Sequence, residues 1–200
     1  MITLDSLTEH QDLLNNAVHA LNARLSQITG KPTSVSLQAT ADDTLLQRMI
    51  ELEKEIFSIE DNVYSREDIL SCLQEEDSLL LTMQVDDRIE GYVFGYDDDV
   101  ENPVVKGTEY FVDSAVVSLQ YQAMGIGSIV GIFVLLVLYL VGYKRIGITT
   151  EVRDKTGREL VGFYHKLGFV DAQTQSGDDY AMMITLDEQM VNKLCTALGL

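Results

Sequence analysis

Two glycines near the middle of the chain, Gly125 and Gly127, lie between a valine-rich stretch and a long apolar stretch. Residues 110–119 are rich in valine and aromatic side chains, which favours a β-strand, and the apolar run after the glycines favours a helix. Glycine lets backbone N–H groups approach a phosphate closely, and the amino end of a helix adds a favourable dipole. The spacing therefore predicts an anion-binding turn between a strand and a helix.

Three kinds of phosphate-binding turn compete for this segment. A dinucleotide fingerprint needs a third glycine where Val130 stands, and a P-loop needs Gly-Lys followed by Ser or Thr, which the chain lacks. What remains is a looser pattern, in which Gln122 is followed after two residues by Gly125 and after one more by Gly127.

This pattern resembles the signature of the GNAT superfamily of N-acetyltransferases, which reads Gln or Arg, two residues, Gly, one residue, and Gly or Ala. Upstream, Ala115–Val117 is similar to the apolar triplet that ends the family's strand, and downstream Phe163–Phe169 is similar to its Leu/Phe-Tyr-x-x-x-Gly-Phe ending. The resemblance covers about residues 40 to 186 in the order of elements. The chain departs from the family at Leu119, where a proline is common, and at Gly157, where many relatives carry an asparagine.

The resemblance implies acetyl-coenzyme A (acetyl-CoA) as the cosubstrate. Its pantetheine arm would lie beside the strand that carries Val116 and Val117, like an additional strand. Backbone amides of the turn would hold the pyrophosphate, and the Gln122 side chain would shape that turn. The predicted amides are those of Ala123, Met124, Gly125, Ile126, Gly127 and Ser128.

The reaction that the family implies is direct attack of an amine on the thioester. A lysine-like amine is mostly protonated at neutral pH, so a carboxylate must take its proton. Glu109 and Asp113 lie four residues apart and share a face if the strand is regular; Glu109 is the first choice, and a bulge in the strand would favour Asp113 instead. Tyr164 matches the family's tyrosine and is the expected acid for the leaving thiolate.

The charge of the chain bears on its partners. Acidic residues outnumber basic ones 32 to 14, giving a net charge of −18, which repels nucleic acid and favours a cationic acceptor. A polyamine, an aminoglycoside, a protein N-terminus and a lysine side chain all remain open, and some relatives use longer acyl chains. The acids expected to select the acceptor are Glu51, Glu53, Glu55, Glu60, Asp61, 75–77 and 97–101. The alternative function is a catalytically degenerate GNAT fold that binds CoA or a partner protein.

The two cysteines and the apolar run bear on the cellular compartment of the protein and on whether it spans a membrane. Cys72 and Cys195 lack metal-ligand spacing and a disulfide framework, which fits a cytoplasmic protein without a metal site, and the first residues do not resemble an export signal. Residues 123–143 contain no charge and are long enough to span a membrane. The resemblance instead makes them a turn and a buried helix, so no membrane partner is expected.

The expected architecture is an α/β domain of the GNAT type, with a mixed, mostly antiparallel sheet flanked by helices over residues 33–200. Residues 1–32 form a separate amphipathic helix, because leucine and isoleucine recur every seven positions from Leu7 to Ile28 before Gly30 and Pro32 end the pattern. The apolar helix after the glycines needs a cover. Either this N-terminal helix or a second subunit, in a homodimer, would supply it.

Overall fold

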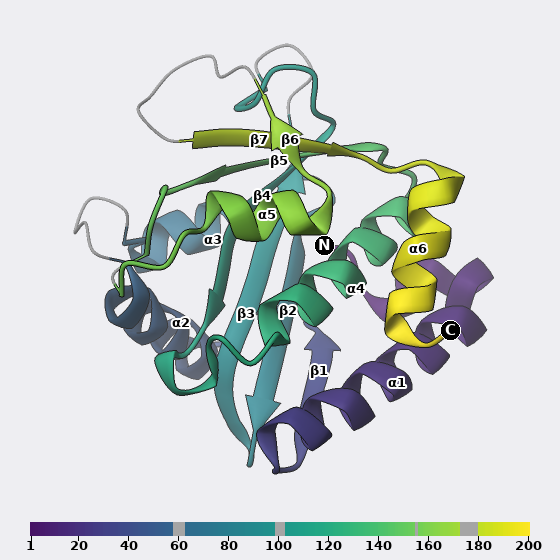
Figure 1. The fold of residues 1–200 in the computed structure, drawn as a ribbon. Helices are drawn as coiled ribbons and strands as arrows, with labels where there is room; N and C mark the ends of the chain where they lie inside the picture. Colours follow the sequence, from purple (N-terminus) through teal and green to yellow (C-terminus); the bar gives the residue numbers. More distant parts are fainter. Residues whose placement is uncertain (58–62, 99–102, 155, 173–179) are drawn as a thin grey trace.

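A mixed β-sheet forms the centre of the computed structural model, which describes residues 1–57, 63–98, 103–154, 156–172 and 180–200. Within these ranges the strands are β1 (Thr33–Leu37), β2 (Leu79–Val85), β3 (Arg88–Asp97), β4 (Tyr110–Val117), β5 (Arg145–Thr150), β6 (Val170–Asp171) and β7 (Tyr180–Thr185). Their order is β1-β2-β3-β4-β5-β7-β6, and every pair of neighbours is antiparallel except β4 and β5 (Figure 1). The predicted mixed, mostly antiparallel sheet is confirmed.

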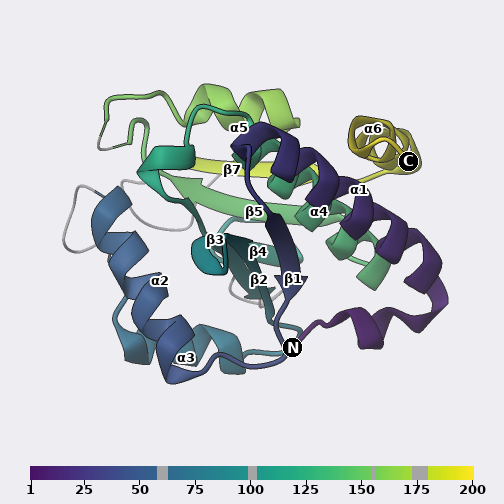
Figure 2. The same cartoon turned by 90° about the horizontal axis from the view of Figure 1, so that it is seen from below.

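Helices cover both faces of this sheet (Figure 2). They are η1 (Leu4–His10), α1 (Gln11–Thr29), α2 (Asp43–Ile56), α3 (Arg66–Gln74), η3 (Leu119–Tyr121), α4 (Ile126–Val141), α5 (Val161–Leu167) and α6 (Glu188–Leu198). α2 and α3 pack on one face through a small apolar cluster that contains Leu46, Leu80 and Tyr92. α1, α4, α5 and α6 share a larger cluster on the other face.

Polar side chains cap the first turns of α2 and α3. The Asp42 carboxylate accepts a hydrogen bond from the backbone N–H of Leu45 at 2.8 Å, which satisfies a free donor of the first turn of α2. Ser65 and Asp68 form a reciprocal capping box at the start of α3.

Thr156 and Glu159 have the spacing of a capping box but do not form one. The Thr156 hydroxyl donates to the Asp154 carboxylate at 2.7 Å, and α5 begins only at Val161, after Leu160, without a side-chain cap. Thr156 belongs to a compact turn in which Asp154 takes up the hydroxyl, so it is not available to cap α5.

The apolar run of residues 123–143 folds as a turn followed by α4, most of whose side chains are buried. α1 packs on α4, its buried Leu14, Ala17 and Leu21 belong to the apolar cluster that both helices share, and α6 packs beside both (Figure 2). None of the helices in the described part of the chain is both long enough and apolar enough to cross a bilayer. The N-terminal helix thus covers α4, while the second subunit stays a prediction.

The N-terminal helix is shorter than its heptad pattern predicts. Residues Leu4–His10 form a 3₁₀ segment with non-helical backbone at Leu7, and the α-helix starts at Gln11. It ends at Gly30 in the left-handed conformation, with φ of 69°, as predicted. Arg24 donates to the carbonyl of Ala197 in α6 at 2.6 Å, so the helix is tied to the rest of the chain.

Candidate active site

The sheet opens between β4 and β5. These parallel strands pair only at Tyr110 with Ile146 and at Phe111 with Gly147, although β4 continues to Val117 and β5 to Thr150. From Val112 onward, the edge of β4 that faces β5 therefore carries backbone groups without a strand partner in the described part of the chain. Unpaired strand edges accept an extended ligand as an additional strand.

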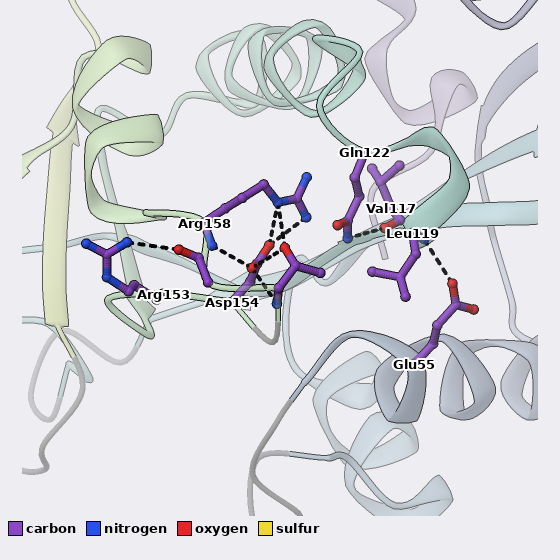
Figure 3. A network of polar contacts seen from close by, with 9 residues as sticks. Glu55, Val117, Leu119, Gln122, Arg153, Asp154 and Arg158 are labelled. Atoms are coloured by element: carbon purple, nitrogen blue, oxygen red, sulfur yellow. Dashed lines mark hydrogen bonds and ion pairs between the residues drawn. The ribbon is translucent and has the colours of Figure 1, made fainter.

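The glycine-bearing turn follows the open end of β4. Ala123 and Gly125 have positive φ, 60° and 81°, and Gly125 caps α4 in the left-handed conformation. A Cβ built on Gly125 would meet no atom within 4 Å, so the space in front of the turn is open. The Gln122 side-chain amide donates to the carbonyl of Val117 at 2.7 Å, which ties the turn to the end of the strand (Figure 3).

A β-bulge lies in β4 at Asp113. On the neighbouring strand β3, Phe94 pairs with Ser114 and the next residue, Gly95, pairs with Val112. Asp113 therefore has no pairing residue on β3. The bulge turns both Asp113 and Ser114 toward the helices α2 and α3. There Tyr64 donates to one Asp113 oxygen at 2.6 Å and the Cys72 thiol donates to the other at 3.3 Å.

Burial controls the protonation of this acid. Burial raises the pKa of Asp113 above its usual range, and the hydrogen bonds from Tyr64, Cys72 and Tyr96 offset only part of that increase. Arg, Lys and His form no ion pair with Asp113 in the described part of the chain. Asp113 is therefore a half-buried carboxyl group to which the described residues supply no cationic partner.

Glu109 lies away from Asp113, outside the cavity. It precedes β4, its carboxylate pairs with Arg145 at 2.8 Å, and it accepts the backbone N–H groups of Lys144 and Arg145. This end of β4 is the paired end, whereas the opening lies at the other end. The structure therefore does not bring the two predicted bases together on one face.

A cavity of about 930 Å³ passes through the opening between β4 and β5. Its lining includes Asp113, Tyr164, Val116, Val117, Gln122, Ala123, Gly125, Gly127 and Ser128 among the predicted site residues. Met124 and Ile126 are not in the lining, because Met124 is exposed and the Ile126 side chain is buried in the core. The volume suits a small-molecule site.

Tyr164 reaches the cavity from α5. Its ring packs edge-on against Phe163 and Phe169, with centroids 5.0 and 5.6 Å away. Burial raises the pKa of Tyr164 to about 12, so the hydroxyl keeps its proton at neutral pH. A protonated hydroxyl in the cavity can donate to a leaving group.

Arg158, in a short turn across the cavity from Gln122, is the cationic side chain of the described lining (Figure 3). Arg158 is the sole Arg, Lys or His among the described residues that line the cavity, and it forms an ion pair with Asp154 at 2.5 Å. Burial alone would raise the pKa of Asp154, but hydrogen bonds from Thr156 and Arg158 lower it to about 2. Sequence reasoning did not identify Arg158, because no local pattern distinguishes it from a surface arginine.

The acids expected to select the acceptor lie elsewhere or outside the described residues. Glu60, Asp61 and 99–101 are outside the described ranges, and the remaining predicted acids do not line the cavity. Glu53 is fully buried beneath the sheet, where Tyr92 and Ser114 donate to one of its oxygens. The acids in the described lining are Asp68, Asp113, Glu151, Asp154 and Glu159.

Comparison with known proteins identifies the family. The sequence pattern of the family described as "Acetyltransferase (GNAT) family" matches residues 46–169, which is more than half of the chain. The chain belongs to this family. The predicted family is confirmed, and at the level of the family so is acyl transfer from coenzyme A to an amine, with acetyl-CoA as cosubstrate. No protein in a curated collection matches the sequence closely enough to extend this result.

Solved structures share the fold at low sequence identity. The acyl-CoA N-acyltransferase of Pseudomonas aeruginosa superposes with a TM-score of 0.59 and 16% identity, over 76% of this chain and 99% of that one. The PaiA N-acetyltransferase of Thermoplasma acidophilum, solved with coenzyme A, gives 0.57 and 16%, over 76% and 99%. A GNAT family acetyltransferase of Elizabethkingia anophelis with acetyl-CoA bound gives 0.55 and 17%, over 77% and 98%.

Proposed function

We propose that the protein transfers an acetyl group from acetyl-CoA to the primary amine of a cationic acceptor. The observation that carries this proposal is the separation of β4 from β5 beyond Phe111, which leaves a free strand edge beside a cavity that ends at the glycine turn. Relatives of the same fold have been solved with coenzyme A and with acetyl-CoA. The residues at the opening fit that cosubstrate.

The donor half of the cavity is the part lined by β4 from Val116, the turn 122–128, and α5. The edge of β4 at Val116 and Val117 would bind the pantetheine amides in the manner of a strand. The backbone amides of residues 123–128 would bind the pyrophosphate, since the amino end of α4 has unpaired N–H groups and a positive dipole end. Open space in front of Gly125 leaves room for the phosphates.

The acceptor is proposed to be a cation because of the charge of the lining. Five carboxylates face one guanidinium in the described lining, and that guanidinium already pairs with Asp154. A cavity lined by acids attracts ammonium groups and repels anionic acceptors. The net charge of −18 acts in the same direction over longer distances.

Asp113 is the proposed base and Tyr164 the proposed acid. Asp113 takes a proton from the ammonium group, the neutral amine nitrogen bonds to the thioester carbon, and the carbon–sulfur bond breaks. The sulfur leaves as a thiol with the proton of the Tyr164 hydroxyl, and the amide nitrogen releases its second proton, which restores that hydroxyl. The raised pKa of Asp113 supports this role, because a stronger base accepts a proton more readily from an amine.

The test is an amine panel assayed for release of free thiol from acetyl-CoA. An acetyltransferase releases thiol only when an acceptor amine is present, and mass spectrometry of the product shows a gain of one acetyl group. A degenerate fold would gain thermal stability with coenzyme A but release no thiol with any amine. That result would contradict the proposed activity while keeping the binding site.

A further inference from the structure

The acceptor half of the cavity is lined by aromatic rings. It comprises Phe57, Tyr64, Tyr96, Val104, Phe111 and Asp113. Tyr64 packs edge-on against Phe94 with centroids 5.4 Å apart, and Tyr96 packs against Phe111 at 6.0 Å. These contacts fix the orientation of the two tyrosine rings beside Asp113.

Asp113 is the anionic group of this half. Its two oxygens accept hydrogen bonds from Tyr64 and Cys72, with a further contribution from Tyr96, but the described residues supply no cation to it. A buried carboxylate without a counter-ion is unfavourable unless it is protonated or a ligand brings the charge. Each carboxylate oxygen has lone pairs for one more donor, so an ammonium group can bind without displacing Tyr64 or Cys72.

Resting on the proposed function, we infer that the acceptor is a small primary amine whose single ammonium group is carried on an apolar or aromatic body. The ammonium group binds Asp113, and the body packs against the rings of Tyr64, Tyr96 and Phe111. Aromatic faces stabilise a nearby cation as well as an apolar body, so the same walls recognise both parts of the ligand.

Polyamines fit this half less well than arylalkylamines do. A polyamine carries further ammonium groups along its length, and each of them would have to leave water in a pocket where the described residues offer few partners. Besides Asp113, the acid that α3 contributes to the described lining is Asp68, which is exposed and already accepts a hydrogen bond from Ser65. Burying an unpaired ammonium group is far more costly than burying a methylene or a ring.

The first experiment measures amine binding to the full chain saturated with coenzyme A, by calorimetry and without turnover. Ethanolamine, propylamine, butylamine and 2-phenylethylamine carry the same single charge on bodies of increasing apolar area. The affinity is expected to rise about fourfold for each buried methylene, and 2-phenylethylamine is expected to bind at least about tenfold more tightly than ethanolamine. A flat series would overturn the inference.

Spermidine and a lysine-containing peptide are the competing acceptors in the same experiment. Either one binding more tightly than 2-phenylethylamine would overturn the inference and leave the proposed acetyl transfer intact. Thiol release that follows the affinity series supports both proposals. Tight binding of 2-phenylethylamine without thiol release would support the inferred ligand class and contradict the proposed transfer.

Variants connect this preference to the pocket. Tyr96→Ala is expected to reduce the ratio of 2-phenylethylamine to ethanolamine affinity by about fivefold. The reason is that the Tyr96 ring packs against the phenyl group of 2-phenylethylamine, whereas ethanolamine has no apolar body to cover that ring. Tyr139→Ala is the matched control, since Tyr139 lies on α4 outside the cavity and stacks under Lys144. An unchanged ratio in Tyr96→Ala would overturn the inference. If that variant does not fold, the binding series of the unaltered chain still decides the question.

Discussion

The donor half and the acceptor half of the cavity are built from different parts of the polypeptide. The proposed donor half presents the backbone of β4 and of the turn 122–128, together with side chains of α5. The acceptor half presents tyrosine and phenylalanine rings around Asp113. Backbone groups can bind a cosubstrate that many relatives share, whereas side chains can be exchanged to suit one acceptor. The following predictions test this division of roles.

The largest effect is expected at Asp113. Asp113→Asn should lower kcat/KM for the amine at least about a hundredfold, because the amide cannot take the proton, with little change in KM for acetyl-CoA. Glu109→Gln is the matched control, since Glu109 lies at the paired end of β4 and pairs with Arg145. Steady-state kinetics with thiol detection measures both. A larger loss in Glu109→Gln would return the base role to Glu109.

The stability of the same variant should depend on pH in a defined direction. The pKa of Asp113 is raised in the folded chain, so folding favours the protonated carboxyl group. Its contribution to stability is present at acidic pH, below the unfolded value of about 3.9, and is lost as the pH rises through the folded pKa. Thermal unfolding should therefore show Asp113→Asn gaining stability relative to the parent as the pH rises over that interval. The opposite slope would exclude a raised pKa.

Tyr164 is the next test, on the donor side. Tyr164→Phe keeps the ring between Phe163 and Phe169 and removes the hydroxyl, so kcat should fall about a hundredfold while KM for acetyl-CoA changes little. Tyr143→Phe is the control, because its hydroxyl donates to Asp77 at 3.0 Å outside the cavity. Turnover within about twofold of the parent in Tyr164→Phe would exclude the acid role.

Gly125 tests whether the donor half relies on backbone geometry. Gly125→Ala and Gly30→Ala place a side chain on left-handed residues with φ of 81° and 69°, and neither new Cβ meets an atom within 4 Å. Both should lose about 1 kcal/mol of stability. Only Gly125→Ala should raise the KM for acetyl-CoA, by about tenfold, because its turn faces the cavity. Equal KM values in the two variants would show that the turn does not bind the cosubstrate.

The smallest effect is expected at a hydrogen bond between α2 and the segment that precedes the turn. Glu55 of α2 accepts the backbone N–H of Leu119 at 2.9 Å, next to the turn (Figure 3). Glu55→Gln should raise the KM for acetyl-CoA by about threefold, because one charge-assisted hydrogen bond to the turn is weakened. Glu51→Gln, on the exposed face of the same helix, is the control. If Glu51→Gln raised the KM as much as Glu55→Gln, the loss of a negative charge, and not the hydrogen bond to Leu119, would explain the effect.

Leu119 shows how a departure from the family pattern acquires meaning in the structure. A proline at this position, common in relatives, has no N–H to donate to Glu55. In this chain the Leu119 N–H donates to Glu55 and so links α2 to the segment just before the turn 122–128. The sequence marked the departure, but the partner 64 positions away could not be predicted from it.

Local interactions account for where several helices begin and end. Asp42 and Ser65 start their helices through hydrogen bonds to residues three positions ahead, and Gly30 ends α1 by its own conformation. The helix α6 was not predicted, although Asp187 caps it in the same way as Asp42 caps α2. Thr156 failed as a cap because Asp154, two residues earlier, takes its hydroxyl.

The sequence by itself determined the glycine turn between strand and helix, since this turn depends on glycine spacing and on the elements that flank it. Only the tertiary structure placed Asp113 rather than Glu109 in the cavity lining, because the bulge at Asp113 depends on pairing with Phe94 and Gly95 of another strand. The same holds for the acceptor half, where Tyr64, just before α3, and Cys72 of α3 reach Asp113 across 49 and 41 positions. Contacts over such separations depend on the packing of α3 against the sheet, which no local spacing encodes.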